Sequence, residues 1–322
     1  MENLGINWKN TRILVTGGTG FVGSHLVEAL VAKGATVFST FQTVQPNSYF
    51  NHKQLGSQVT LLQTNITNFE DLFHFITKSD IEYIFHLAAQ PIVETAYYNP
   101  RQTFNTNIMG TVNILESARL FTKIKGVIVA SSDKSYGRTD NKEYFETDPL
   151  KGTHPYEVSK SAADLITLTY AKTYNLPVVI TRFGNIYGEG DLNYSRIIPG
   201  IMNSIITKKP LEIRSDGTFV RDYLHVKDVV TGYMAIAENM NTCIGEAFNF
   251  GSDDTRSVLD VLAIAQDILK TKIEYVVKNN AKNEIPYQSL NFDKAKKILS
   301  WRPQFDLKST LPEIIKYYQS LT

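Results

Sequence analysis

A short apolar strand runs directly into a glycine-rich turn near the start of the chain, and few folds accommodate this junction. Residues 12–16 are followed by Gly17-Gly18-Thr19-Gly20-Phe21-Val22-Gly23, and residues 21–33 have a helical pattern. Glycines at these positions permit a tight turn, a close approach of the backbone to a pyrophosphate, and close packing of a helix on a strand. The N–H groups at the start of the helix are free to bind phosphate. The turn therefore predicts a dinucleotide-binding site on a parallel sheet.

Apolar runs alternate with amphipathic stretches through the first half of the chain. We predict strands at 12–16, 36–40, 59–62, 83–87, 126–130 and 178–182. The predicted helices between them lie at 21–33, 69–78, 105–120 and 156–174. Strands that are apolar throughout and joined by crossover helices form a parallel sheet covered on both faces. Because such crossovers are right-handed, the predicted fold is α/β, a doubly wound parallel (Rossmann) sheet.

The alternation breaks after residue 182, where Gly, Pro, Asn and Asp become frequent at 184–200 and 210–217. This change predicts a smaller α/β lobe in the C-terminal part of the chain that binds the substrate. Segments 226–238 and 247–250 can still return to the large sheet, so we expect the two parts to be interleaved in sequence. The predicted division is a dinucleotide-binding domain at 1–182 and 221–251 and a substrate lobe at 183–220 and 252–322.

The composition excludes several classes of function. The 33 Lys and Arg nearly balance the 32 Asp and Glu, so no overall field favours nucleic acid or a membrane surface. No stretch approaches the roughly 20 apolar residues of a membrane span, and residues 1–12 lack the apolar run of a signal peptide. The single cysteine, Cys243, rules out an intramolecular disulfide and fits a small buried residue in a reducing compartment. We expect a cytoplasmic protein with no metal, nucleic acid or membrane partner.

The second predicted strand lacks the acid that usually binds the adenine ribose of a dinucleotide. It ends in Ser39-Thr40-Phe41-Gln42-Thr43, without Asp or Glu and without an Arg that would hold a 2′-phosphate. Thr40 or Gln42 can bond a ribose hydroxyl, although both also fit as ordinary loop residues. Asn65 and Ile66 follow the third strand, where an Asp-hydrophobic pair usually contacts adenine. The residues leave NADP open, and NAD is the favoured cofactor.

Three side chains are suited to proton transfer: one follows the fifth predicted strand, and two lie at the start of the predicted helix at 156–174. Ser132 lies at the carboxyl end of a strand, where doubly wound folds bind substrates. Tyr156 and Lys160 are four residues apart and therefore share one helix face. An ammonium beside a phenol favours the phenolate, so we expect Lys160 to lower the pKa of Tyr156 and make it a general base. The set predicts proton transfer at a sugar or alcohol that is oxidised by hydride transfer.

These residues lead to a resemblance that covers nearly the whole chain. The sequence resembles an extended short-chain dehydrogenase/reductase of the NAD-dependent epimerase/dehydratase family, whose members act on nucleotide sugars. Besides the glycine turn, Tyr156 and Lys160, it is carried by the motifs His86-Leu87-Ala88-Ala89-Gln90, Thr106-Asn107-Ile108-Met109-Gly110-Thr111, Arg182-Phe183-Gly184-Asn185-Ile186-Tyr187-Gly188, Arg221-Asp222-Tyr223-Leu224-His225-Val226 and Trp301-Arg302-Pro303.

The resemblance implies binding roles in both parts of the chain. Ala88 and Ala89 would line the nicotinamide pocket, where small residues permit a close approach. Arg221 would pair with the substrate diphosphate, and Arg196 is either a second phosphate ligand or part of an exposed salt bridge. The implied cofactor set is Gly17, Gly20, Phe21, Val22, Thr40, Gln42, Asn65, Ile66, Leu87, Ala88, Ala89, Tyr156 and Lys160. The implied substrate set is Gln90, Ser132, Asn185, Arg196 and Arg221.

The resemblance also implies a homodimer formed through the helices at 105–120 and 156–174. Asn107 fits a structural hydrogen-bonding residue better than a catalyst, and His86 fits a packed core residue at the end of a strand. Contacts to the nucleotide base are expected from the second lobe around 194–214, where no residue pattern identifies the base.

Asp133 and Lys134 bear on the choice between two reactions that begin alike. In both, Tyr156 takes the proton of the C4 hydroxyl while hydride leaves C4 for the nicotinamide. A 4-epimerase then returns the hydride to the other face and needs no further acid or base. A 4,6-dehydratase must also remove the C5 proton and protonate the departing C6 hydroxyl. Asp133 would be that acid, and Lys134 would be the base if its pKa is depressed.

An Asp-Lys pair resembles the CDP-glucose 4,6-dehydratase type and also the inverting UDP-N-acetylglucosamine dehydratases, and the surrounding motifs favour the former. Two features depart from that type: Val22 stands where a Lys is usual, and Arg221-Asp222-Tyr223 follows the epimerase pattern. We predict a dehydratase of an NDP-hexose similar to CDP-glucose. The alternatives are a 4-epimerase in which Asp133 and Lys134 form a surface turn, reductase or decarboxylase chemistry, and a non-catalytic sensor on this fold.

Overall fold

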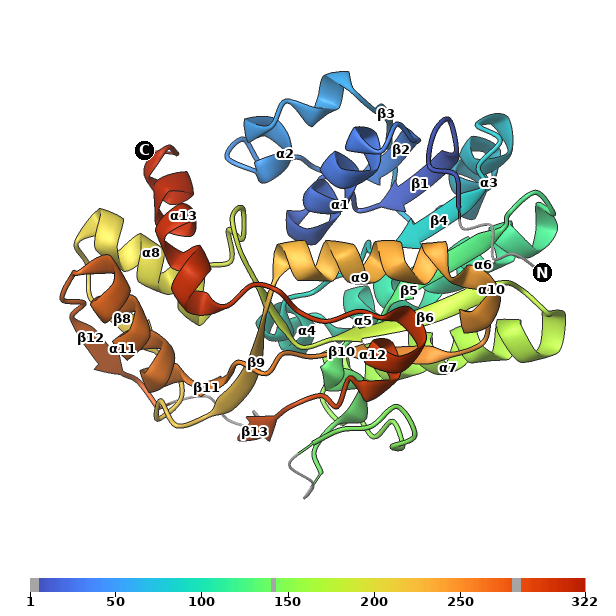
Figure 1. Cartoon of the computed structure of the whole chain (residues 1–322). Helices are drawn as coiled ribbons and strands as arrows, with labels where there is room; N and C mark the ends of the chain where they lie inside the picture. The colour runs from blue at the N-terminus through green and yellow to red at the C-terminus, as the bar shows by residue number, and fades with distance from the viewer. Residues whose placement is uncertain (1–5, 140–142, 280–284, 322) are drawn as a thin grey trace.

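Seven parallel strands form the larger sheet of the computed structural model, which describes residues 6–139, 143–279 and 285–321 (Figure 1). The strand order is β10-β6-β5-β4-β1-β2-β3, and every neighbouring pair is parallel. The chain builds outward from β1 in both directions, so the predicted doubly wound α/β fold is confirmed. The strands are β1 (Arg12–Thr16), β2 (Thr36–Phe41), β3 (Thr60–Gln63), β4 (Tyr83–His86), β5 (Gly126–Ala130), β6 (Val178–Phe183) and β10 (Ala247–Phe250).

The six strands predicted in the first half of the chain are present, with ends shifted by at most one residue. The segment at 247–250 does return to the sheet, where it pairs with β6. Successive residues of each strand point to opposite faces. Ile13 and Val15 therefore enter the core on one face, while Leu14 enters the core on the other. Burial on both faces explains why the strands are apolar throughout.

Helices cover both faces of the larger sheet (Figure 1). On one face α1 (Phe21–Ala32) and α9 (Val226–Glu238) pack against each other through residues such as Leu26 and Val229. The other face is covered by α3 (Phe69–Lys78), α6 (Gly110–Leu120) and α7 (Pro155–Tyr174).

The helix predicted at 105–120 is not uniform. It begins with a π-helical turn, η2 (Asn105–Met109), which continues from α5 (Pro100–Phe104), and α6 follows it. Such π-turns widen the backbone locally and often occur at functional sites. Here the turn carries Asn107.

The C-terminal lobe is built on a smaller sheet, in which β7 (Asn185–Tyr187), β11 (Thr255–Ser257) and β13 (Tyr287–Gln288) pair with β9 (Val220–His225). Figure 1 shows the lobe at one end of the larger sheet, on the left. Its own apolar core joins α8 (Ile197–Thr207), α11 (Val258–Leu269), α13 (Leu307–Gln319) and the paired strands β8 (Leu211–Ile213) and β12 (Tyr275–Val277).

The shorter elements complete the structure and include the turn that carries Asp133. No helix among the described residues is long and apolar enough to cross a membrane.

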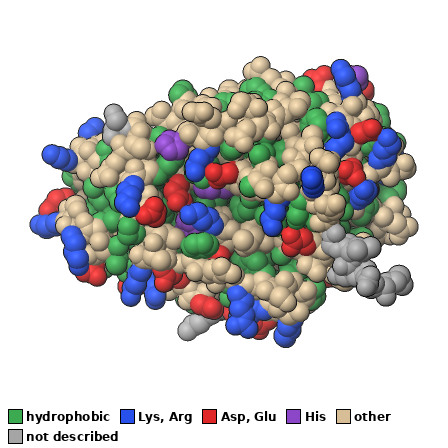
Figure 2. Space-filling model, turned by 45° about the horizontal axis from the view of Figure 1, so that its top comes forward, with side chains coloured by type: hydrophobic (Ala, Val, Ile, Leu, Met, Phe, Trp, Pro, Cys, Tyr) green, Lys and Arg blue, Asp and Glu red, His purple; other side chains and the backbone are tan. Residues whose placement is uncertain are grey.

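Cys243 is buried, as expected. Figure 2 shows Lys and Arg interspersed with Asp and Glu over the face in view, which fits the balanced charge. The shorter elements are α2 (Tyr49–His52), η1 (Leu55–Ser57), α4 (Val93–Tyr98), η3 (Asp133–Tyr136), α10 (Met240–Cys243) and α12 (Asp293–Leu299).

Candidate active site

A cleft of about 1280 Å³ lies between the carboxyl ends of the larger sheet's strands and the C-terminal lobe. Doubly wound sheets bind ligands at this edge. Residues that follow β1, β2, β4 and β5 line one wall, and residues of β7, β8 and β9 line the other. Of the residues predicted from sequence, the cleft brings together Gly17, Gly20, Phe21, Val22, Thr40, Gln42, Ile66, Leu87, Ala88, Ala89, Ser132, Asp133, Lys134, Tyr156, Asn185, Arg196 and Arg221.

Three predicted residues do not line the cleft. Asn65 is exposed, and its side chain accepts a hydrogen bond from the Thr67 amide at 3.0 Å. Gln90 turns its side chain onto the backbone of its own loop. Lys160 is buried, and its ammonium bonds a strand end. A ligand contact of Asn65 or of the Gln90 side chain stays a prediction.

The glycine turn leaves open space where a pyrophosphate would bind. An added Cβ would lie 3.0 Å from the Ala88 backbone at Gly17, where φ is +71°, and 2.2 Å from the Gly17 carbonyl oxygen at Gly23. The protein's own packing therefore requires both of these glycines. Gly20 differs, because a Cβ there would meet only the Gly17 carbonyl oxygen, at 3.3 Å. Its missing side chain keeps the start of α1 open to the cleft, where free N–H groups bind phosphate.

Tyr156 is buried at the start of α7, beside Ser132. Burial raises the pKa of its phenol to about 12, and the nearby Asp133 carboxylate adds to the rise. The positive charge of Arg196 and a hydrogen bond with Ser132 act in the opposite direction. The phenol is therefore protonated at neutral pH in this form of the protein.

Lys160 lies one turn further along α7 and is 7% exposed. Burial lowers the pKa of its ammonium to about 8, against a smaller opposing effect of Asp164. The ammonium donates to the Ala130 carbonyl at 2.8 Å, so it faces the end of β5. The sequence-based expectation that Lys160 lowers the pKa of Tyr156 is wrong for this structure, because burial of the phenol dominates and raises it.

Replacing Lys160 with methionine is expected to stabilise the protein at neutral pH. The lysine pKa falls from 10.5 to about 8 on folding, so between these values the unfolded chain binds more protons and stability rises with pH. Below pH 8 the folded wild type carries the full cost of the buried charge, roughly 3 kcal/mol by this shift. Urea unfolding at pH 7 and pH 10 should show the variant's advantage shrinking at the higher pH. An equal difference at both pH values would contradict this account.

Asp133 and Lys134 form an ion pair in η3, directly after Ser132. Lys134 Nζ lies 2.9 Å from Asp133 Oδ2, and the Ser132 hydroxyl donates to Asp133 Oδ1 at 2.9 Å. The Ser132 oxygen also accepts from the Lys134 amide and so caps the turn. The side chain of Asp133 is 5% exposed and that of Lys134 is 21% exposed. The alternative of a solvated surface turn is therefore wrong, since both residues line the cleft.

Three arginines of the C-terminal lobe line the cleft, Arg196, Arg214 and Arg221, and the sequence analysis singled out the first and the last. Arg196, directly before α8, forms an ion pair with Asp191 at 3.0 Å and is close enough to Tyr156 to lower its pKa. Arg221 on β9 is 8% exposed and donates to the Val220 carbonyl at 2.8 Å. Arg196 thus forms the salt bridge that was one of its two predicted roles, and it also lines the cleft, where the other role, binding of a phosphate, is possible.

His86 and Asn107 have the supporting positions expected for them. His86 is buried, burial lowers its pKa to about 3, and its two ring nitrogens lie 2.8 and 3.1 Å from the hydroxyls of Thr16 and Thr111. Asn107, in the π-turn η2, donates to the Ser159 hydroxyl at 2.8 Å and accepts at 2.7 Å from an amide of the loop after β4. The π-turn therefore connects that loop to α7 through the side chain of Asn107.

The amino-acid sequence matches the model of the NAD dependent epimerase/dehydratase family over residues 13–251. The chain belongs to this family. The match begins in β1 and ends just after β10, so it includes the glycine turn, η3 and the start of α7. The resemblance drawn from the motifs is confirmed.

Curated relatives in this family include a dehydratase and a decarboxylase. CDP-glucose 4,6-dehydratase of Salmonella typhimurium is 31% identical, and the match covers 97% of this chain and 92% of that protein. UDP-N-acetyl-alpha-D-glucosaminuronate decarboxylase of Bacillus cytotoxicus is 30% identical, with 96% and 98% of the two chains covered.

Solved structures of similar proteins include a further dehydratase and an epimerase. dTDP-glucose 4,6-dehydratase from Bacillus anthracis in complex with NAD has a TM-score of 0.84 and 28% identity, covering 96% of this chain and 97% of that one. UDP-glucuronic acid 4-epimerase from Bacillus cereus, in complex with UDP-glucuronic acid and NAD, has a TM-score of 0.89 and 26% identity, covering 97% and 100%.

NAD is the cofactor of this family, and the prediction of NAD from sequence is confirmed. The cleft fits a dinucleotide at the open glycine turn. Its wall beside β2 is neutral: among the described residues there, the lining consists of Thr40, Phe41, Gln42, Thr43, Gln45, Thr64 and Ile66. The described residues of this wall therefore offer a ribose only neutral groups.

Gly20→Ala is expected to fold normally and to bind NAD at least tenfold more weakly. Gly20 has a φ of −79°, which alanine adopts freely, so the cost in stability should stay below about 1 kcal/mol. The added methyl group would project into the space reserved for the pyrophosphate. Calorimetric titration with NAD measures the loss, and Gly56→Ala, where a Cβ would also meet a single atom at 3.6 Å, is the matched control. Unchanged affinity would place the pyrophosphate elsewhere.

No sequence signal pointed to Gln288, which lines the cleft and lies opposite Arg221 where β13 pairs with β9. The residue is 2% exposed, and neither amide atom has a hydrogen-bond partner of good geometry among the described residues. The Tyr144 hydroxyl lies beside it but donates its one proton to the Gly137 carbonyl at 2.8 Å. The amide oxygen of Gln288 therefore lacks a donor, which is rare for a buried group. Because β13 has only two residues, its strand pattern is too short to reveal this position.

Proposed function

We propose that the protein is a nucleotide-sugar 4,6-dehydratase that converts an NDP-hexose similar to CDP-glucose to the NDP-4-keto-6-deoxyhexose. The observation that carries this proposal is the Asp133–Lys134 ion pair beside Ser132 and Tyr156 in the cleft. An epimerase needs no acid or base beyond the tyrosine, whereas a dehydratase needs both next to C5 and C6. The 31% identity to a CDP-glucose 4,6-dehydratase across 97% of the chain supports the same choice.

In this proposal the two parts of the chain divide the binding. Residues 1–182 and 226–251 hold NAD, with the pyrophosphate at Gly20 and the nicotinamide against Ala88 and Ala89. The sequence-based boundary at residue 221 is moved to 226, because β9 (Val220–His225) pairs within the smaller sheet of the C-terminal lobe. Bound NAD would accept the hydride from C4 and give it back at C6 within one turnover. The lobe formed by residues 183–225 and 252–322 holds the nucleotide sugar.

Substrate contacts come from side chains that face the cleft from the C-terminal lobe. Arg221 and Arg196 pair with the diphosphate, whose charge their planar guanidinium groups match. Asn185 bonds the diphosphate or the sugar. Gln288 is expected to bond a hydroxyl of the hexose, which can give its buried amide oxygen the missing donor.

The first proton transfer belongs to Tyr156. Its phenol oxygen takes the proton of the C4 hydroxyl, and the hydrogen bond with Ser132 and the charge of Arg196 both favour the phenolate that this requires. Because burial holds the pKa near 12, the oxidation rate is expected to rise with pH through the neutral range.

The Asp133–Lys134 pair contains the proton that the elimination needs. Moving one proton from Lys134 Nζ to Asp133 Oδ2, which are 2.9 Å apart, turns the ion pair into a carboxylic acid and a neutral amine without exchange with solvent. A substrate that excludes water favours this neutral form, since separated charges are costly in a dry site. The amine then takes the C5 proton while the acid protonates the C6 hydroxyl, which leaves as water. Lys134 finally returns its proton to C5.

One cycle leaves Tyr156 with the proton of the C4 hydroxyl and Asp133 without the proton given to the leaving water. Ser132 lies between the two groups: its hydroxyl donates to Asp133 at 2.9 Å and is hydrogen-bonded to Tyr156. The arrangement supports return of the proton from Tyr156 to Asp133 before the next turnover.

We also propose that the protein acts as a homodimer. Large apolar side chains of η2, α6 and α7 are exposed, with Met109 and Leu120 at 47%, Leu165 at 53% and Tyr174 at 51%. A face of this kind is typical of a subunit interface. Sedimentation equilibrium tests the proposal, and a monomer at micromolar concentration would refute it.

A 4-epimerase is the second candidate. It is favoured by the Arg221-Asp222-Tyr223 pattern and by the TM-score of 0.89 to the UDP-glucuronic acid 4-epimerase of Bacillus cereus. In that case Tyr156 and Ser132 keep their roles, and Asp133 and Lys134 take no part in the chemistry.

A product screen by mass spectrometry across CDP-, dTDP-, UDP- and GDP-hexoses and the corresponding NDP-uronic acids tests the proposed function. Loss of one water from any of them supports a dehydratase and names the base. An unchanged mass with altered stereochemistry supports the epimerase instead. Loss of carbon dioxide from an NDP-uronic acid would show decarboxylase chemistry and refute both.

A further inference from the structure

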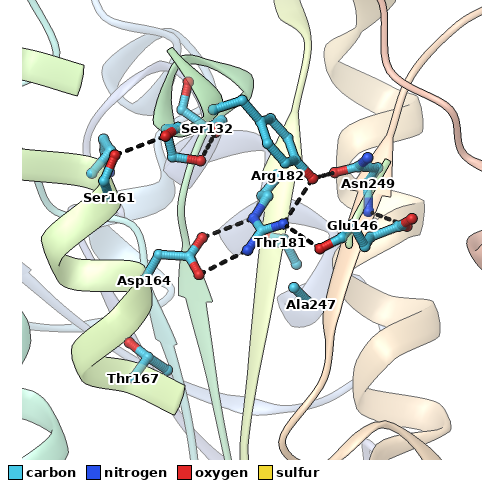
Figure 3. Close-up of polar contacts among 12 residues, drawn as sticks. Ser132, Glu146, Ser161, Asp164, Thr167, Thr181, Arg182, Ala247 and Asn249 are labelled. Carbon is cyan, nitrogen blue, oxygen red and sulfur yellow. Dashed lines mark hydrogen bonds and ion pairs between the residues drawn. The ribbon is translucent and has the colours of Figure 1, made fainter. Parts of the chain in front are cut away.

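A buried polar network centred on Arg182 joins two elements of the proposed site. Arg182 lies on β6 and is 2% exposed. Its Nε and Nη2 donate to both carboxylate oxygens of Asp164 on α7, at 2.8 and 2.9 Å. Its Nη1 donates to the Tyr136 hydroxyl, at the end of η3, at 2.7 Å. Figure 3 shows the guanidinium of Arg182 between Asp164 on one side and Asn249 on the other.

The network continues from Tyr136 to β10. The Tyr136 hydroxyl donates to the Asn249 side-chain oxygen at 2.7 Å, so both its proton and a lone pair are used. Asn249 in turn donates to the Tyr144 carbonyl at 3.0 Å and, through its backbone amide, to the Glu146 carboxylate at 2.9 Å. The Tyr136 ring stacks on the Tyr144 ring, with centroids 5.1 Å apart. Tyr136, the last residue of η3, is thus hydrogen-bonded to β6 and β10 and packed against Tyr144.

Asp164 and Tyr136, the two partners of Arg182, lie on the elements that carry the proposed reacting groups. Asp164 is four residues after Lys160 and eight after Tyr156, on the same face of α7. Tyr136 is three residues after Asp133, at the other end of the single turn η3. A second bond joins the same elements, because the Ser161 hydroxyl of α7 donates to the Ser135 carbonyl at 2.7 Å. The guanidinium of Arg182 therefore connects α7, which carries Tyr156, to η3, which carries Asp133 and Lys134.

We propose that Tyr136 and Arg182 are positioning residues that set the Asp133–Lys134 pair relative to Tyr156. A buried ion pair such as Arg182–Asp164 adds little stability over apolar side chains of similar size. Its geometric effect is larger, because the elimination needs an acid at C6 and a base at C5 at the same moment. Displacements of about 0.5 to 1 Å are enough to impair such an arrangement. The inference rests on the proposed dehydratase function.

Tyr136→Phe tests the inference, because it removes one hydroxyl and keeps the ring, its stacking and the Arg182–Asp164 ion pair. We expect NAD and CDP-glucose to bind with unchanged Kd, and C4 oxidation, followed as NADH absorbance in a single turnover, to stay near the wild-type rate. Formation of the 4-keto-6-deoxy product should fall roughly 10- to 100-fold in kcat, with KM unchanged.

The matched control is Tyr170→Phe on α7, the helix that carries Asp164; the Tyr170 hydroxyl donates to Glu116 at 3.1 Å and not to η3. It should leave both steps unchanged. A purely structural role of Tyr136 would lower the melting temperature and slow oxidation and elimination together. Equal losses in the two steps, or no loss in either, would overturn the proposal.

The proposed function can fail separately from the inference. If the wild type forms no dehydrated product, the dehydratase proposal is refuted, and a crystal structure of Tyr136→Phe still tests the positioning. We expect the Asp133 carboxylate to move by about 0.5 Å or more relative to Tyr156. An unmoved carboxylate would overturn the inference whatever the reaction.

Discussion

Tyr156→Phe is expected to slow oxidation at C4 by about a thousandfold, within the range by which a general base accelerates such steps. Phenylalanine keeps the ring and its packing and removes only the oxygen that would take the C4 proton. Single-turnover measurement of NADH absorbance reports this step directly, whichever reaction follows it. The wild-type rate should rise with pH, since burial holds the pKa of the phenol near 12 and only the phenolate can act as the base.

Binding affinity is the control for Tyr156→Phe. The Kd for NAD and for the nucleotide sugar should change little, because the lost hydroxyl acts mainly in the transition state. The rise of the remaining slow rate with pH should disappear with the phenol. A variant that oxidises substrate within tenfold of the wild type, with the same pH dependence, would show that another group is the base.

The parallel sheet could be predicted because each strand carries its pattern within a few residues. Ile13, Leu14 and Val15 are buried on alternate faces, and a run of this kind identifies a strand covered on both sides. The π-turn at Asn107 left no such pattern. It depends on bonds to Ser159 and to the loop after β4, which become neighbours of Asn107 only in the folded chain.

The candidate site shows the same division. Ser132, Asp133 and Lys134 were found because one short motif after a strand carries all three. The direction of the Lys160 ammonium could not be predicted in this way. Sequence spacing places Lys160 on the same helix face as Tyr156, but it does not reveal that the ammonium donates a hydrogen bond to the Ala130 carbonyl. Gln288 was missed because its place in the cleft comes from pairing with β9, which is distant in sequence.

Removing either member of the Asp133–Lys134 pair is expected to block elimination while C4 oxidation continues. Asp133→Asn keeps the size of the side chain but has no acidic proton to give, and Lys134→Met keeps the apolar stem without the base. Formation of the 4-keto-6-deoxy product should fall at least a hundredfold in each variant. NADH and the 4-keto hexose should then accumulate to about one equivalent per site. Because the two residues share one proton, the double variant should be no slower than the slower single variant.

Proton exchange at C5 separates the two roles. In D₂O, Asp133→Asn should still exchange the C5 proton of the oxidised sugar, slowly, because Lys134 can become neutral by losing its proton to solvent once the carboxylate is absent. Lys134→Met should show no exchange, and NMR of the recovered sugar distinguishes the two variants. Lys172→Met, an exposed lysine of α7, is the matched control and should behave as the wild type. Losses that add in the double variant, or loss of oxidation together with elimination, would contradict a shared proton. Full activity of both single variants would favour the epimerase, in which the pair has no chemical task.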